Sequence, residues 1–211
     1  MRDIVPVAGI NRSPAVLVVN PSFPTKNLSE FIAYAKSSPG KVAYASGGSG
    51  SVSHLYGELF RSLAGVELLH IPYRGPGPAL IDVLSGHVPV IFESMATATE
   101  HIKAGRLRPL GVTTATRVEG LPNIPSISEF VPSCDAIGWT GVGAPRNTPS
   151  AIIDALNQAI NASLTDSRMA TRLAELSNVP LSMTPREFGK FIADETEKYA
   201  KVIRAANIKP E

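Results

Sequence analysis

Short apolar runs alternate with amphipathic segments along the first half of the chain. The apolar runs, each of which predicts a strand, lie at residues 15–19, 42–45, 66–73, 87–94 and 106–114. The segments between them have apolar residues at helical spacing, and each is long enough for a crossover between parallel strands. The pattern therefore predicts an α/β fold with a mostly parallel sheet over residues 10–115.

Capping residues and apolar stripes indicate where the helices begin and which faces they bury. Asn27 with Glu30 has the spacing of a capping box. A helix over residues 52–64 is expected to bury a stripe made of Leu55, Leu59, Phe60 and Leu63.

The second half has a different pattern. Residues 117–145 are rich in Pro and Gly, and they contain a predicted strand at Ala136–Val142. Two amphipathic helices follow, one from Thr148 and Pro149 and one from the capping box at Thr184, with a short strand at 179–183 between them. The first helix is expected to bury Ile152, Leu156, Ile160 and Leu164, and the last to bury Phe188, Phe191, Ile192, Tyr199 and Ile203. Two strands are too few for a separate sheet, so we expect this part to pack on another surface.

Composition narrows the class of protein. The chain has 211 residues, 44% of them hydrophobic, and a net charge of +2, which is typical of a globular domain and gives no basis for nucleic-acid binding. The single cysteine, Cys134, excludes an internal disulfide and a cysteine-based zinc site. The first residues lack the pattern of a signal peptide, and no apolar run reaches the length of a membrane span.

The candidate chemistry lies in a Gly-rich loop, Ser46-Gly47-Gly48-Ser49-Gly50-Ser51, between a predicted strand and helix. The loop does not match the phosphate-binding P-loop, the dinucleotide fingerprint or the nucleophile elbow. A helix N-terminus with free N–H groups and hydroxyls suits a carboxylate. The alternative is that the glycines only form a tight turn and Ser51 only caps the helix.

Further candidates lie at the ends of the other strands. Tyr73, Arg74 and Gly75 follow one strand, and Glu93 ends the next, so they are expected at the same edge of a parallel sheet as the Gly-rich loop. His54 is placed to orient that loop, and His70, within an apolar strand, is interpreted as a core histidine.

Two hydroxyls complete this set of candidates. Thr113 and Thr114 lie at the exit from the last strand of the first half, which is a natural hinge position.

Catalytic groups are not evident. Ser51 and His54 are close in sequence, but no acid accompanies them, and Cys134 has no histidine nearby. No cluster has the spacing of metal ligands. We therefore expect no catalytic residues, no metal and no cofactor.

At these residues the chain resembles the Bug family, the periplasmic solute receptors of tripartite tricarboxylate transporters. The segments "YASGGSGSVSH", "HIPYRG", "LPNIPSISE", "GWTGVGAPRNTP" and "TPREFGKFIADETEKYAKVIRAANIK" carry the resemblance, which covers essentially the whole chain. Ser51 stands where Thr is usual in the family, Arg74 where Lys is usual and Glu93 where Asp is frequent.

The resemblance implies a two-lobed fold of the type II periplasmic-binding-protein kind. It implies a periplasmic receptor that closes on a small carboxylate (a di- or tricarboxylic acid, an acidic amino acid or an aromatic acid) and docks on membrane transporter subunits. The ligand residues it implies are Ser46, Gly48, Ser49, Gly50, Ser51, His54, Tyr73, Arg74, Gly75 and Glu93.

The chain departs from the family pattern at its start, because it lacks the usual N-terminal segment. Residues 10–115 are therefore expected to form a complete α/β lobe, and residues 116–211 with 1–9 a partial second lobe. This implies weak ligand binding and exposed apolar surface, which a homodimer would cover.

Two other functions stay open. One is an enzyme of acyl or phosphoryl transfer that uses the Gly-rich loop. The other is a non-binding remnant that acts through a partner protein.

Overall fold

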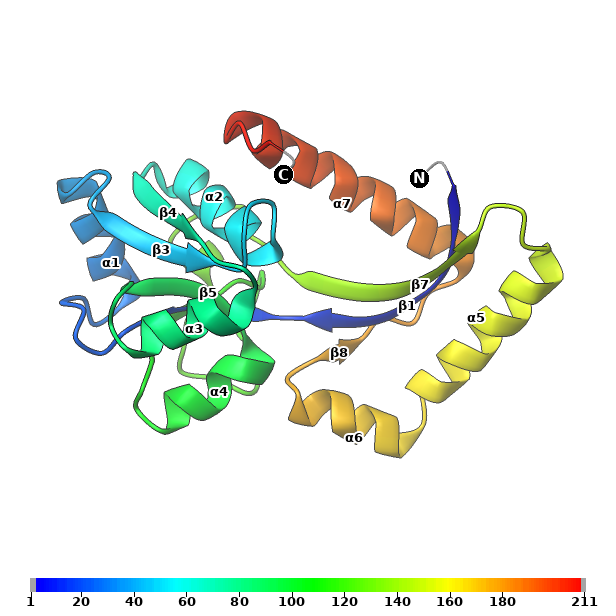
Figure 1. The fold of residues 1–211 in the computed structure, drawn as a ribbon. Helices are drawn as coiled ribbons and strands as arrows, with labels where there is room; N and C mark the ends of the chain where they lie inside the picture. Colours follow the sequence, from blue (N-terminus) through cyan, green and yellow to red (C-terminus); the bar gives the residue numbers. More distant parts are fainter. Residues whose placement is uncertain (1–2, 210–211) are drawn as a thin grey trace. The chain divides into compact units, whose positions relative to one another are not determined.

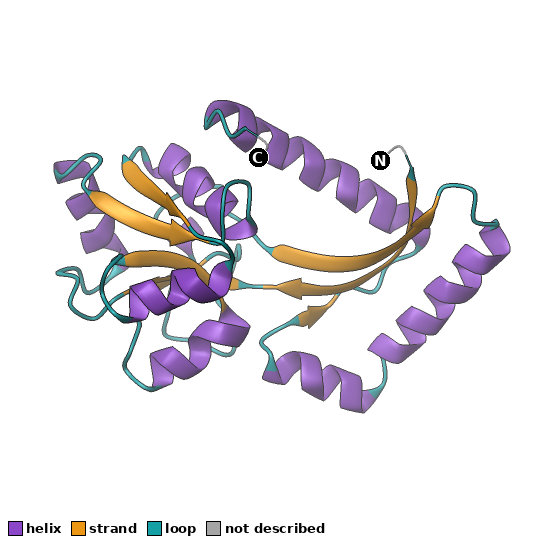
Figure 2. Ribbon diagram, viewed as in Figure 1, coloured by secondary structure: helices purple, strands orange, loops and turns teal. Residues whose placement is uncertain are grey.

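The computed structural model describes residues 3–209, which form two compact units (Figures 1 and 2). Unit 1 consists of the described residues up to Ser13 together with Gly138–Ala200. Unit 2 consists of Pro14–Ile137 together with the described residues from Lys201 onward.

Unit 1 is built on a small antiparallel sheet. Its strands are β1 (Ile4–Ser13), β7 (Gly138–Pro145) and β8 (Val179–Pro180), in the order β7-β1-β8. Its helices are α5 (Ser150–Leu164), α6 (Ser167–Glu175) and the first part of α7 (Pro185–Ala205). The sequence pattern identified β7 and β8 but missed β1, the longest strand, and the short helix α6.

The helix starts in unit 1 follow local capping chemistry. The Thr184 backbone N–H donates to the Glu187 carboxylate at 2.9 Å, and the Glu187 N–H donates to the Thr184 hydroxyl at 3.2 Å, which confirms the predicted capping box. The carboxylate of Asp166 accepts from the N–H groups at the start of α6.

The predicted buried face of α5 was wrong at Ile152 and Leu156, whereas Leu164 is buried as predicted. The helix buries Ile153 and Asn157 and leaves Ile152 50% exposed. The cause is a polar contact that periodicity does not reveal. The Asn157 side-chain amide donates to the carbonyls of Val7 and Met183, each at 2.8 Å, and this turns a polar position toward the sheet.

Unit 2 contains a five-stranded sheet in the order β4-β3-β5-β2-β6. The strands are β2 (Ala15–Val19), β3 (Val42–Ser46), β4 (Leu68–Pro72), β5 (Val90–Ser94) and β6 (Arg108–Val112). β3 is parallel to β4 and β5, but β2 is antiparallel to β5 and β6, so the sheet is mixed and not mostly parallel. The lengths of the crossovers could not reveal this, because both neighbours of β2 lie far along the chain.

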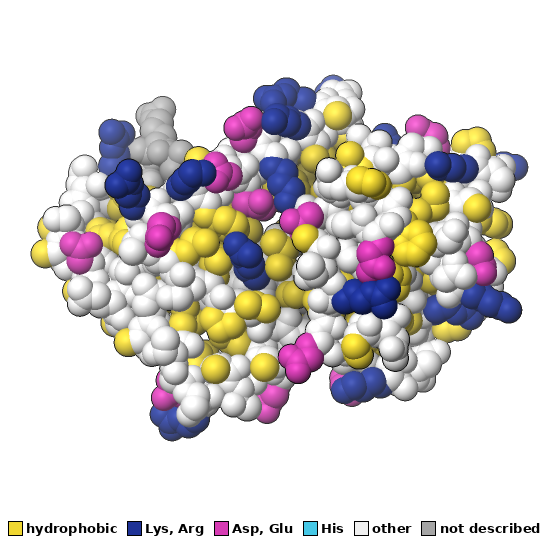
Figure 3. All heavy atoms as spheres, turned by 180° about the vertical axis from the view of Figure 1, so that it is seen from behind, with side chains coloured by type: hydrophobic (Ala, Val, Ile, Leu, Met, Phe, Trp, Pro, Cys, Tyr) yellow, Lys and Arg dark blue, Asp and Glu magenta, His cyan; other side chains and the backbone are white. Residues whose placement is uncertain are grey.

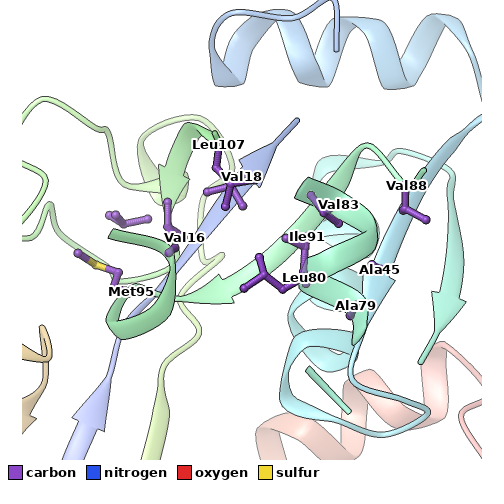
Figure 4. Close-up of a cluster of buried hydrophobic side chains, with 12 residues drawn as sticks. Val16, Val18, Ala45, Ala79, Leu80, Val83, Val88, Ile91, Met95 and Leu107 are labelled. Carbon is purple, nitrogen blue, oxygen red and sulfur yellow. The ribbon is translucent and has the colours of Figure 1, made fainter. Parts of the chain in front are cut away.

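Helices cover both faces of this sheet. They are α1 (Leu28–Ser37), α2 (Val52–Ala64), α3 (Pro76–Leu84) and α4 (Met95–Lys103). Val16, Val18 and Ile91 pack with side chains of α3 and α4, such as Val83 and Met95 (Figure 4).

The opposite face carries the aromatic side chains of α1, α2 and β5. The rings of Phe31, Phe60 and Phe92 pack in series there. The buried face of α2 also differs from the predicted stripe, because it includes His54 and Glu58, whereas Leu63 is 42% exposed.

Residues 116–137 fold back onto β6 in unit 2. The Ala136 N–H donates to the Thr113 carbonyl at 2.8 Å, and the Ser126 hydroxyl donates to the Thr114 carbonyl. A 3₁₀ turn at Ile127–Glu129 buries Ile127 against Gly111. The two units divide after residues 13, 137 and 200, so residues 116–137 belong to the unit that carries the Gly-rich loop.

Candidate functional site

The Gly-rich loop joins the end of β3 to the start of α2, as predicted. Ser51 is the N-cap of α2, and its hydroxyl accepts from the His54 backbone N–H at 3.4 Å. Gly48 and Gly50 have φ angles of 123° and 72°, which side chains rarely tolerate. A Cβ atom on Gly48 would also lie 3.1 Å from the Tyr73 carbonyl, so this glycine permits a close backbone approach.

The second loop lies directly against the first. β3 and β4 are parallel neighbours, with Ser46 opposite Pro72, so both loops leave the same edge of the sheet. The Tyr73 N–H donates to the Ser46 carbonyl at 3.0 Å, and the Gly75 N–H donates to the Gly47 carbonyl at 3.2 Å. The structure thus brings together the two loops that the sequence had placed at one edge.

Most N–H groups of the Gly-rich loop are bonded within unit 2. Gly47 donates to the Ser53 hydroxyl at 3.0 Å, Gly48 to the Ser46 hydroxyl at 3.1 Å, and Gly50 to Nδ1 of His54 at 3.0 Å. Ser46 is fully buried, so its hydroxyl serves the loop itself. Within residues 3–209, the Ser49 N–H has no hydrogen-bond partner, and Ser49 is exposed.

The open donors therefore lie around Ser49. The first N–H groups of α2 add to them, because the first turn of a helix has no intrahelical acceptor for its N–H groups. This combination suits one carboxylate oxygen pair held by neutral donors.

Two histidines, His54 and His70, contact the Gly-rich loop through hydrogen bonds. The rings of His54 and His70 stack with centroids 3.7 Å apart and an interplanar angle of 8°. Nε2 of His70 lies 2.6 Å from the Ser46 hydroxyl oxygen. The position of His54 agrees with its expected orienting role, but the contact of His70 with the loop was missed, because strand pairing alone brings His70 beside Tyr44 and Ser46.

Polar side chains of β3 and α2 lie beside the histidine pair. The Tyr44 hydroxyl donates to Oε1 of Glu58 at 2.7 Å, and Arg61 lies 3.4 Å from the other Glu58 oxygen. Burial, with the Glu58 carboxylate, raises the pKa of Tyr44. Burial lowers the pKa of His54, and burial together with the nearby His54 lowers the pKa of His70 to about 4.

Tyr73 and Arg74 lie at the same edge of the sheet but differ in whether their side chains already have a partner. The Tyr73 hydroxyl donates to Asp82 at 2.7 Å. Burial, together with this hydrogen bond, raises the pKa of Tyr73 to about 12. Arg74 is exposed and has no ion-pair partner among the described residues.

Glu93 differs from these two because it is buried. Its carboxylate accepts from the Ser94 N–H at 3.0 Å, and burial raises its pKa. Because β5 runs parallel to β3, with Ile91 opposite Ala45, Glu93 lies at the same strand ends as the loop.

The serine and histidine geometry does not assemble a nucleophile. Ser51 bonds the backbone of His54, and the Nδ1 atom of that imidazole is occupied by Gly50, so the two side chains do not form a nucleophile–base pair. Ser46 is close to His70 but is fully buried, out of reach of a substrate. No group of three or more potential metal ligands occurs in residues 3–209.

These features define an α/β protein in which two strand-end loops meet at one edge of the sheet and leave backbone donors open at Ser49. The chain belongs to the tripartite tricarboxylate transporter family of receptors, whose model matches residues 1–208. Family members and structural neighbours are solute-binding receptors and not enzymes.

Relatives and solved structures agree with this assignment. BugT of Bordetella pertussis is 37% identical over 99% of this chain and 64% of its own length. A UPF0065 protein from Pseudomonas sp. strain P51, in the tcbD-tcbE intergenic region, is 35% identical over 96% of this chain and 61% of its own. R. palustris Rpa4515, solved with adipate, superposes with a TM-score of 0.90 at 34% identity and covers 99% of this chain and 70% of its own.

The chain spans less than two thirds of the length of these curated relatives. None of the helices in the described part is both long and apolar enough to cross a bilayer. On the face shown in Figure 3, basic and acidic side chains are interspersed, so that face has no large patch of a single sign.

Proposed function

We propose that the chain is part of an extracytoplasmic receptor that captures a small carboxylate and delivers it to a tripartite tricarboxylate transporter. The observation that carries this proposal is the open donor set at Ser49 and the start of α2, beside Tyr73–Gly75. The two compact units would be the two lobes of the receptor. A periplasmic location and docking on membrane subunits belong to the same proposal, because they follow from the family.

Dicarboxylates are the ligand class that we favour. The Rpa4515 structure holds adipate, and the structure of MatC from Rhodopseudomonas palustris, 29% identical over 95% of this chain with a TM-score of 0.84, holds malate. In this chain one carboxylate would be held at Ser49, with Arg74 free to approach a second charge. Glu93 would form hydrogen bonds with a ligand hydroxyl or amine, and its length relative to the frequent Asp would change the size of the pocket.

A thermal-shift screen followed by isothermal titration calorimetry tests the proposal. The panel contains adipate, malate, citrate, glutamate and benzoate, with a neutral diamide as the negative control. A ligand present at about a hundred times its Kd adds about 2.7 kcal/mol of stability, which gives a measurable rise in Tm. No response to any acid, from a folded sample, would refute carboxylate capture by this chain.

Two matched variants locate the site. Ser49→Asp adds a negative charge beside the proposed carboxylate. For a separation of about 5 Å the repulsion is about 3 kcal/mol, which weakens binding by about two orders of magnitude. Ser49→Asn has nearly the same shape without the charge and is expected to bind within a few-fold of the parent. Equal affinities for the two variants would place the ligand elsewhere.

Enzymatic transfer is the second function to exclude. The geometry around Ser51 and Ser46 gives it no support, and turnover of an activated ester or a phosphate ester by this chain would favour it. A remnant that acts only through a partner protein would give no ligand response in the panel but would be captured by the transporter subunits.

A further inference from the structure

The Gly-rich loop contacts the imidazole rings of His54 and His70 through hydrogen bonds. The bond to His54 requires one protonation state of that ring. The Gly50 N–H donates to Nδ1 of His54 at 3.0 Å, so this nitrogen must carry a lone pair. A proton on Nδ1 would place two donors against each other and remove the bond. The hydrogen of neutral His54 is then on Nε2, which lies 3.9 Å from Oε1 of Glu58.

His70 supports the same arrangement from β4. Its ring stacks on that of His54, and its Nε2 atom contacts the Ser46 hydroxyl, which accepts from the Gly48 N–H. The stack therefore reaches two loop amides, one directly and one through Ser46. A positive charge on either ring would lie against its stacked partner.

Each element packed against His54 contributes a group to its surroundings. They are Tyr44 from β3, Glu58 and Arg61 from α2, His70 from β4, and Lys209 beyond α7. Glu58 favours a charge on His54, but its oxygens are already engaged by Tyr44 and Arg61. Burial and Arg61 oppose that charge, and the pKa of His54 is lowered as a result.

A proton can nevertheless reach the rings. A pocket of about 450 Å³ opens beside them, lined by residues that include Ser49, Arg61 and Asn207 as well as both histidines. Ser49 is also the residue with the open N–H, so solvent in this pocket meets the same loop that holds the ligand.

We propose that His54 is a positioning residue that holds the Gly-rich loop in its ligand-binding form only while its imidazole is neutral. This inference rests on the proposed function for its effect on ligand affinity. Its effect on the loop itself is independent of any ligand. Acidification would release the Gly50 N–H, loosen the loop and weaken carboxylate binding.

Three variants separate this role from simple packing. In His54→Asn the amide oxygen replaces Nδ1 as an acceptor but does not titrate. His54→Leu keeps apolar volume and removes the acceptor. His87→Asn changes an exposed histidine outside the site and serves as the matched control.

Calorimetric titration with adipate and with malate, at several values from about pH 8 to about pH 4, measures the effect on affinity. We expect His54→Leu to bind about tenfold more weakly than wild type at neutral pH, and His54→Asn and His87→Asn to bind within about threefold. Wild type and His87→Asn should lose affinity in acid by more than His54→Asn does. Identical acid profiles for wild type and His54→Asn would overturn the proposal.

Hydrogen exchange of the Gly48 and Gly50 amides tests the loop without a ligand. Protection of Gly50 should be lost in His54→Leu, kept in His54→Asn, and lost in wild type together with protonation of His54 Nδ1 in the ¹⁵N NMR spectrum. The wild-type titration needs no variant, so it decides the matter even if His54→Leu does not fold. Failure of carboxylate binding with this exchange pattern intact would refute only the proposed function, whereas unchanged Gly50 protection would refute the role of His54.

Discussion

Replacing Gly57 with Ala sets helix propensity against steric overlap. Gly57 lies inside α2, where Ala is intrinsically better by about 1 kcal/mol. A Cβ atom at this position would overlap Cε2 of Tyr44 and lie 2.6 Å from its Cζ atom. Tyr44 is fully buried and held by Glu58 and the neighbouring His70 ring, so it cannot move aside.

We expect the steric overlap to outweigh the gain in helix propensity, so that Gly57→Ala destabilises the fold. Overpacking a rigid core costs about 1–3 kcal/mol, and an approach this short to a held ring lies in the upper part of that range, about 2–3 kcal/mol. Subtracting the propensity gain of about 1 kcal/mol leaves a net loss of unfolding free energy of about 1–2 kcal/mol. For a chain of this size that lowers Tm by about 2–8 °C. Urea denaturation followed by circular dichroism, together with calorimetry, measures both quantities.

Two comparisons make this prediction refutable. Ser62→Ala, at an exposed position of the same helix, gains propensity without overlap and should be neutral or slightly stabilising. In a Tyr44→Leu background the ring is absent, so Gly57→Ala should no longer destabilise. A stabilising effect of Gly57→Ala in the wild type, or the same loss in both backgrounds, would contradict the packing described for α2 and β3.

Three further predictions follow from named contacts. Thr184→Ala removes the hydroxyl of the capping box of α7 and should lower the unfolding free energy measured in urea by about 1 kcal/mol. An unchanged free energy would contradict this and would mean that Glu187 alone caps the helix. Tyr44→Phe deprives the buried Glu58 carboxylate of a donor and should cost about 1.5–3 kcal/mol by the same assay; a neutral result would mean that water replaces the hydroxyl. His70, whose pKa falls from an ordinary 6.5 to about 4 in the folded chain, stabilises above pH 6.5, so the unfolding free energy should decline from about pH 6.5 to about pH 4, and His70→Asn should flatten that decline.

The sequence pattern predicted local structure well where a single segment determines it. The strand at 15–19, the helix at 52–64 and the capping box at Thr184 depend on neighbouring residues, and the structure confirms them. Asn27 caps its helix as predicted, but the Glu30 carboxylate accepts from the Lys26 N–H, so the predicted capping box forms only in half. The direction of β2 and the buried Asn157 depend on segments far along the chain, so periodicity could not reveal them.

The candidate site shows the same division. The two loops could be placed at one edge because strand order along the chain and parallel pairing determine it. Which loop donors stay open could not be predicted, because Ser46, Ser53 and His54 fold back on the loop and occupy most of them. From the sequence, the hydroxyls of Ser46, Ser49 and Ser51 were equivalent candidates. In the structure Ser46 is buried and Ser51 caps α2, so Ser49 is the one of the three that is exposed and not used by the loop.

The internal hydrogen bonds of the loop explain why so many polar residues surround a site that needs few donors. A glycine loop without them would be free to adopt many conformations, and a ligand would have to order it at a cost in affinity. The Ser46, Ser53 and His54 side chains remove that freedom before the ligand arrives. In the proposed receptor the loop would therefore present prearranged donors at Ser49 and the start of α2, and its readiness to bind would depend on side chains that need not touch the ligand at all.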